Sequence, residues 1–64
     1  MRIIELTKLP NCDKAHVNVN AIIRYVRYGE ANFTWVEFGY TDSEIRVQET
    51  PEQITELIKK APEL

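Results

Sequence analysis

The sequence predicts an α+β domain, a small antiparallel β-meander of 4–5 strands with one C-terminal helix packed on one face. Three observations predict this class. Residues 50–53 form a helix start signal, and the chain before them alternates apolar and polar side chains as half-buried strands do. The connections between the alternating stretches are short, so strands that are neighbours in sequence are expected to pair. The 64 residues have room for one domain, 1–64.

The first two strands are predicted at the amino-terminal end. Residues 3–9 place Ile4 and Leu6 on one face. A turn is expected at 10–13, because proline fixes φ and short polar side chains bond to the local backbone. Residues 15–20 alternate again, which predicts a second strand antiparallel to the first.

Three further strands are predicted where β-branched and aromatic residues concentrate, at residues 22–28, 33–38 and 44–48. The chain must bend between the second and third strands, so a short turn is expected within residues 18–21. The stretches 29–32 and 39–43 have the usual length of hairpin loops.

The helix start is the most specific local signal. Thr50 is a good N-cap, Pro51 suits the first helical position, and Gln53 can complete a capping box. The helix should end before Pro62, because the residue preceding a proline avoids the helical region. Its apolar stripe should pack on the sheet, and consists of Ile54, Leu57, Ile58 and Ala61.

The small size of the chain favours self-association. A chain this short is marginally stable alone, and Cys12 is the only cysteine, so no intrachain disulfide can supplement the core. No metal-ligand set is present either. Oligomerisation is the remaining common means of stabilisation, and a homo-oligomer is expected.

Aromatic residues crowd the central hairpin. One tryptophan, three tyrosines and two phenylalanines all lie between residues 25 and 40, more than one small core face can hold. The face opposite the helix should therefore carry Trp35 with Phe33, Tyr25 or both. Exposed aromatics mark interfaces, and tryptophan, tyrosine and arginine dominate binding energy there. The predicted partner- or ligand-binding residues are Trp35, Phe33, Tyr25, Tyr28, Arg24 and Arg27.

Several other classes are disfavoured. Cys12 and His16 lack the further ligands that zinc needs and the third group of a nucleophilic site, so no catalytic residue, metal or cofactor is expected. The segment 24–28 interleaves arginine and tyrosine, as single-strand nucleic-acid binders do. However, the net charge of −2 and the lack of a basic cluster disfavour nucleic acid as a partner.

No stretch approaches the roughly 20 apolar residues of a membrane-spanning helix. The amino-terminal residues do not have the apolar core of a signal peptide, so a cytoplasmic protein is expected.

A family resemblance is carried by the stretches 4–9, Val17-Asn18 with Ile22, Thr34, Val36, Phe38-Gly39, Val47, Glu49, and the helix with Ile54 and Ile58. In these stretches the chain resembles the FlbD-like family of small flagellar and swarming motility proteins, and similar small phage-encoded proteins. The chain departs from the family in its aromatic hairpin and at residues 10–12, where the family turns on glycine. The resemblance implies a non-enzymatic accessory protein and assigns no catalytic residue.

The expected function is therefore that of a small non-enzymatic interaction protein. It would self-associate and bind a protein partner through the aromatic hairpin, in a motility-related role according to the resemblance. The alternative is a phage-encoded binder or inhibitor of a small, nucleotide-like ligand, with its pocket at an oligomer interface.

Overall fold

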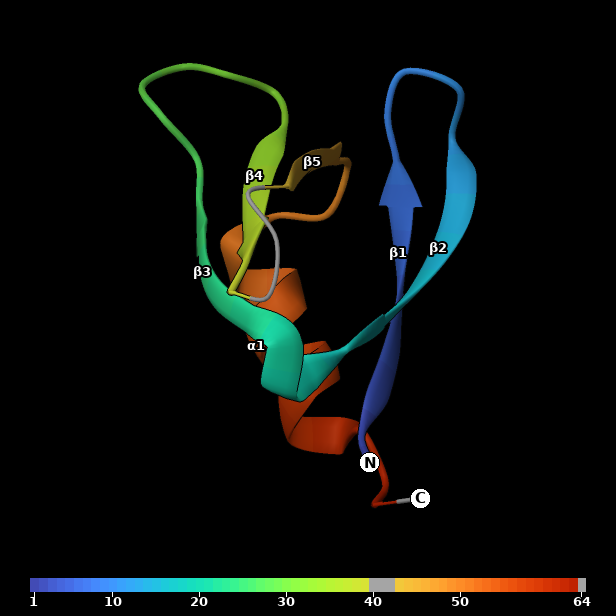
Figure 1. The fold of residues 1–64 in the computed structure, drawn as a ribbon. Helices are drawn as coiled ribbons and strands as arrows, with labels where there is room; N and C mark the ends of the chain where they lie inside the picture. Colours follow the sequence, from blue (N-terminus) through green and yellow to red (C-terminus); the bar gives the residue numbers. More distant parts are fainter. Residues whose placement is uncertain (40–42, 64) are drawn as a thin grey trace.

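The computed structural model describes residues 1–39 and 43–63. Its elements, in chain order, are β1 (Ile3–Lys8), β2 (Asp13–Asn18), the 3₁₀ turn η1 (Val19–Ala21), β3 (Ile22–Val26), β4 (Thr34–Phe38), β5 (Glu44–Val47) and α1 (Pro51–Lys60). In this part of the chain, five strands form one antiparallel sheet, and α1 packs on one of its faces (Figure 1). The predicted α+β class, the strand number and the C-terminal helix are confirmed.

The strand order, β2-β1-β5-β4-β3, differs from a simple meander at one place. The pairs β1/β2, β3/β4 and β4/β5 join sequence neighbours as expected. β2 and β3 do not pair but lie at opposite edges of the sheet, and β1 pairs with β5 instead. The reason is η1, a single 3₁₀ turn that redirects the chain without folding it back into a hairpin (Figure 1).

The bend predicted within residues 18–21 is confirmed as η1. Asn18 is its N-cap, and the side-chain oxygen of Asn18 accepts a hydrogen bond from the backbone N–H of Asn20 at 2.9 Å. The turn at the end of β1 is also present, and Cys12 adopts a left-handed φ of 61° there. Residues 40–42 of the predicted loop at 39–43 lie outside the described residues.

The core lies between the sheet and α1. Its buried members are Ile4, Leu6, Val36, Phe38, Val47 and Ile54. The predicted apolar stripe of the helix is confirmed, since Leu57, Ile58 and Ala61 pack against the same cluster. Ile54 is completely buried whereas Leu57 is only partly buried, so Ile54 is the main contact of the helix with the core.

The start of α1 has the predicted geometry. The side chain of Thr50 accepts from the backbone N–H of Gln53 at 3.1 Å, and the side chain of Gln53 accepts from the backbone N–H of Thr50 at 2.8 Å. This reciprocal pair is a capping box, and Pro51 occupies the first helical turn. The capping box fixes the point at which the chain leaves the sheet and enters the helix.

Replacing the N-cap should weaken the helix. Thr50→Ala removes the acceptor for the N–H of Gln53, and we expect a loss of about 1 kcal/mol of unfolding free energy. Thr50→Ser retains a hydroxyl at this position and serves as the control. Urea denaturation followed by circular dichroism measures both variants. Equal midpoints for Thr50→Ala and the wild type would show that the cap contributes nothing.

Truncating the two helix residues should have unequal effects. Ile54→Ala removes a fully buried side chain and should lower the unfolding free energy by about 2–5 kcal/mol. Leu57→Ala should lower it less, because part of that side chain already contacts water. Thermal and urea denaturation give the comparison. A larger loss for Leu57→Ala would contradict this placement of the helix.

Candidate functional site

The face of the sheet opposite α1 carries an aromatic patch. Along β4, Thr34, Val36 and Phe38 are buried, whereas the alternate residues Trp35 and Glu37 are only half-buried. Successive side chains of a strand point to opposite faces. Trp35 and Glu37 therefore lie on the face away from the helix, as expected for Trp35.

We call Val26, Phe33, Trp35 and Arg46 the outer patch. The rings of Phe33 and Trp35 meet edge to face, with centroids 5.5 Å apart and an interplanar angle of 84°. The guanidinium of Arg46 lies over the Phe33 ring, 5.7 Å from its centroid. Val26 and Arg46 are the strand neighbours of Trp35 on either side. Aromatic and cation–π contacts of this kind hold the patch in a defined shape.

An ion pair borders the outer patch. Arg24 on β3 lies opposite Glu37 on β4 and donates two hydrogen bonds to its carboxylate, at 2.8 and 2.9 Å. These hydrogen bonds, together with the charge of Glu37, raise the pKa of Arg24 above its ordinary value. Because Arg24 is exposed, the pair orients both side chains and adds little to stability. Arg24 thus lies at the rim of the aromatic cluster, where the sequence predicted an arginine.

Tyr25 does not join Trp35 on the outer face, and that alternative for the aromatic face is wrong. In the register of β3 and β4, Tyr25 lies opposite Val36, which is buried under the helix. The Tyr25 hydroxyl lies 2.8 Å from the Thr55 hydroxyl of α1, within hydrogen-bond distance. Strand alternation is the physical reason, since Arg24 and Val26 flank Tyr25 and point outward. Tyr25 therefore connects sheet and helix.

Arg27 lies apart from the outer patch, whereas Tyr28 lies within electrostatic reach of Arg24 at the border of the patch. Arg27 donates to the hydroxyl of Thr34 at 3.2 Å and to the backbone carbonyls of Gln48 and Glu49 at 3.3 and 3.5 Å. It supports the segment that leads into α1. Tyr28 follows β3 and is exposed. Of the six predicted binding residues, the structure brings Phe33 and Trp35 together, with Arg24 and Tyr28 at the border.

Arg46 was not among the binding residues predicted from the sequence. This residue lies directly opposite Trp35 in the β4/β5 ladder. Its outward direction could have been inferred, because Ile45 and Val47 on either side face the core. The missing information was the hairpin register, which decides that Arg46 and not Arg27 covers the aromatic rings.

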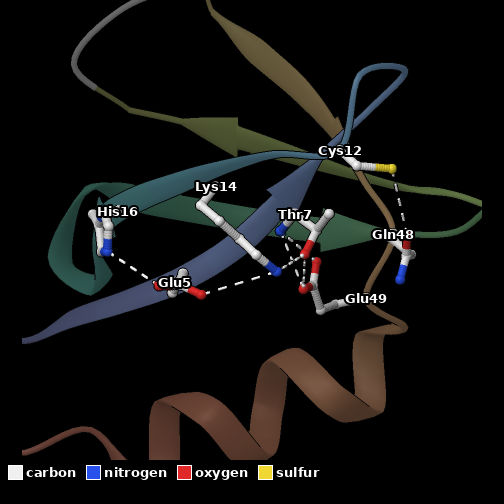
Figure 2. A network of polar contacts seen from close by, with 7 residues as sticks. All are labelled: Glu5, Thr7, Cys12, Lys14, His16, Gln48 and Glu49. Carbon is white, nitrogen blue, oxygen red and sulfur yellow. Dashed lines mark hydrogen bonds and ion pairs between the residues drawn. The ribbon is translucent and has the colours of Figure 1, made fainter.

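A network of polar contacts lies on a second surface, over β1, β2 and the segment that leads into α1 (Figure 2). The carboxylate of Glu49 accepts from the backbone N–H of Thr7, with its two oxygens at 2.9 and 3.1 Å. It also accepts from the Thr7 hydroxyl at 2.9 Å, and that hydroxyl accepts from Lys14 Nζ at 3.1 Å. Thr7 is buried, so its hydroxyl is not available to a substrate.

The same network continues along β1 to Glu5. One carboxylate oxygen of Glu5 lies 3.2 Å from His16 Nε2, and the other lies 4.0 Å from Lys14 Nζ (Figure 2). All three side chains are exposed. At exposed positions, water screens ion pairs of this kind. The cluster is therefore described as a surface ion network.

Across residues 1–39 and 43–63, no group of three or more histidine, cysteine, aspartate or glutamate side chains is arranged to hold a metal ion. In the same ranges, no helix has the length and apolar character needed to cross a membrane.

Comparisons of the chain with family models, with curated proteins and with solved structures found no match.

Removing the Glu49 carboxylate should destabilise the protein. Glu49→Ala leaves two donors of the buried Thr7 without this charged acceptor, and we expect a loss of about 1.5–3 kcal/mol of unfolding free energy. Glu49→Gln retains one acceptor oxygen and should lie between the wild type and Glu49→Ala. Urea denaturation provides the measurement.

Glu30→Ala is the control for this series, because Glu30 is exposed in the loop between β3 and β4. A surface change of this kind is expected to stay within about 0.5 kcal/mol. If Glu49→Ala matched Glu30→Ala, the carboxylate would have no structural role.

Proposed function

We propose that this protein is a small, non-enzymatic, cytoplasmic interaction module that self-associates and binds a protein partner through the outer patch. The observation that carries the proposal is the half-exposed Trp35, held edge to face by Phe33 on the face that the helix leaves uncovered. Burial of the apolar area of these rings lowers the free energy, and this gain requires another surface that covers them.

The composition of the outer patch supports a protein partner. Tryptophan and arginine are enriched among the residues that dominate protein interfaces, and both occur here at the centre of the sheet face. The Arg24–Glu37 pair supplies a polar border, as interface rims usually have. A two-fold contact between copies would place Trp35 near the same residue of its mate.

The resemblance to the FlbD-like family extends this proposal to an accessory role in motility. Under the alternative, a small nucleotide-like ligand would stack on the same aromatic and arginine side chains at an oligomer interface. Arg46 over the Phe33 ring is the feature that such a planar ligand would use.

Trp35→Ala tests the proposal. Loss of a central interface tryptophan should weaken self-association by about 30-fold or more in dissociation constant. Light scattering and sedimentation across a micromolar concentration series measure the mass. Since Trp35 is the only tryptophan, its fluorescence should also shift to shorter wavelength as the wild type associates. Arg46→Glu alters the same patch at an exposed position and should weaken association without removing core contacts.

Lys59→Ala is the control, because Lys59 is an exposed residue of α1, which covers the opposite face of the sheet from the outer patch. It should leave the mass unchanged. A wild type that stays monomeric throughout the series would exclude self-association through this face. A nucleotide that raises the melting temperature by binding the native state would favour the ligand-binding alternative.

A further inference from the structure

A groove runs between β1 and α1, on a different surface from the outer patch. It has a volume of about 470 Å³, and its walls include Glu5 from β1, Glu49, and the helix residues Glu52, Glu56, Leu57 and Lys60. Four carboxylates thus line one groove beside a single ammonium group. Leu57 contributes a partly buried apolar surface.

The backbone of β1 is open toward this groove. The N–H of Val19 donates to the carbonyl of Arg2, and the β1/β2 register continues from this pair. Even-numbered residues of β1 therefore direct their backbone groups to β2. Thr7 directs its backbone groups to the other side, where its carbonyl accepts from the N–H of Gln48. Because alternate residues of a strand bond on the same side, Ile3 and Glu5 direct their N–H and carbonyl groups there too.

No strand pairs with Ile3 or Glu5 on that side among the described residues. The ladder between β1 and β5 is limited to Lys8 and Val47. Beyond it, β5 has ended and the chain has turned into α1. The amino-terminal half of β1 therefore presents an unpaired strand edge beside the groove.

Both ends of this open edge are occupied by side chains. At one end, the Glu49 carboxylate accepts from the N–H of Thr7, in the position where a strand carbonyl would accept. At the other end, Arg2 donates to the backbone carbonyls of Ile58 and Ala61 at the end of α1. The open edge is the interval between these two contacts.

We propose that this groove binds an extended, lysine- or arginine-containing segment of a partner protein, which pairs with the backbone of Ile3 and Glu5. Addition of a strand to an open edge is a common mode of peptide recognition, with backbone bonds giving affinity and side-chain contacts giving specificity. Here the specificity is for positive charge. Glu52 and Glu56 are exposed on the helix wall and face an occupant that lies along β1.

The neighbouring charges do not neutralise the groove. Glu5 shares its carboxylate with Lys14 and His16, and Glu56 lies 3.8 Å from Lys59 at the surface. Glu52 has no such ion pair among the described residues. Exposed pairs of this kind are weak, so the carboxylates remain available to a cationic segment.

The test uses a defined probe, an acetylated and amidated peptide with alternating lysine and valine. Titration into the isotope-labelled protein, followed by amide hydrogen exchange, should show new protection of the Ile3 and Glu5 amides. Fluorescence anisotropy of a labelled peptide gives the affinity. The double variant Glu52→Gln/Glu56→Gln should weaken binding about threefold to tenfold. Glu30→Gln, an exposed carboxylate away from the groove, should not change it.

Two control ligands separate backbone pairing from charge alone. An alternating lysine and proline peptide has the same charge but lacks half of the backbone donors, and it should bind more weakly. An alternating glutamate and valine peptide should not bind. Absence of binding by the lysine and valine peptide would overturn the proposal. So would equal binding of spermine or of the proline peptide, or binding without protection of Ile3 and Glu5. Retention of peptide binding by Trp35→Ala would separate this result from any failure of the outer patch.

Discussion

The carboxylate of Glu49 holds the two parts of this sheet together. One part is the β1/β2 hairpin and the other is the group β3, β4 and β5, and the direct ladder between them is limited to Lys8 and Val47. Glu49 extends this ladder through its side chain by accepting from Thr7. Its backbone carbonyl accepts from the hydroxyl of Thr34 at 2.7 Å. One residue thereby connects β1 and β4 immediately before the helix cap.

The aromatic residues of the central hairpin divide between two faces with different roles. Tyr25 and Phe38 belong to the helix side, where Phe38 is buried in the core. Phe33 and Trp35 belong to the outer side and are half-buried. One ten-residue helix can cover only one face of a five-stranded sheet. The second face therefore retains exposed apolar area. Its burial under another surface would lower the free energy by roughly 25 cal/mol per Å².

Local signals in the sequence predicted the elements well, because each depends on a few adjacent residues. Thr50 and Gln53 bond to each other across one turn, so the helix start is encoded within four positions. Alternation in β1 and β4 likewise follows from the two-residue period of a strand. The fold class and the direction of Trp35 could be predicted for this reason.

The features that the sequence did not predict depend on contacts between distant residues. The bond between Glu49 and Thr7 joins residues 42 positions apart, and nothing near either residue indicates the other. The pairing of β1 with β5 can be predicted only if it is known that η1 does not form a hairpin. The sequence left Tyr25 as an alternative member of the outer face, because one register step exchanges inward and outward side chains. Arg46 was missed for the same reason.

The pairing of an early strand with a late one also determines when the molecule can fold. On the ribosome, the β1/β2 hairpin emerges first, but Ile4 and Leu6 find their core partners Val47 and Ile54 only after those residues have been made. Contacts that are distant in sequence slow folding, because the loop between them must close first. Until β5 and α1 have been made, the apolar face of the β1/β2 hairpin stays exposed to water. The β1/β2 hairpin, the remaining strands and the helix are therefore expected to form in one cooperative step.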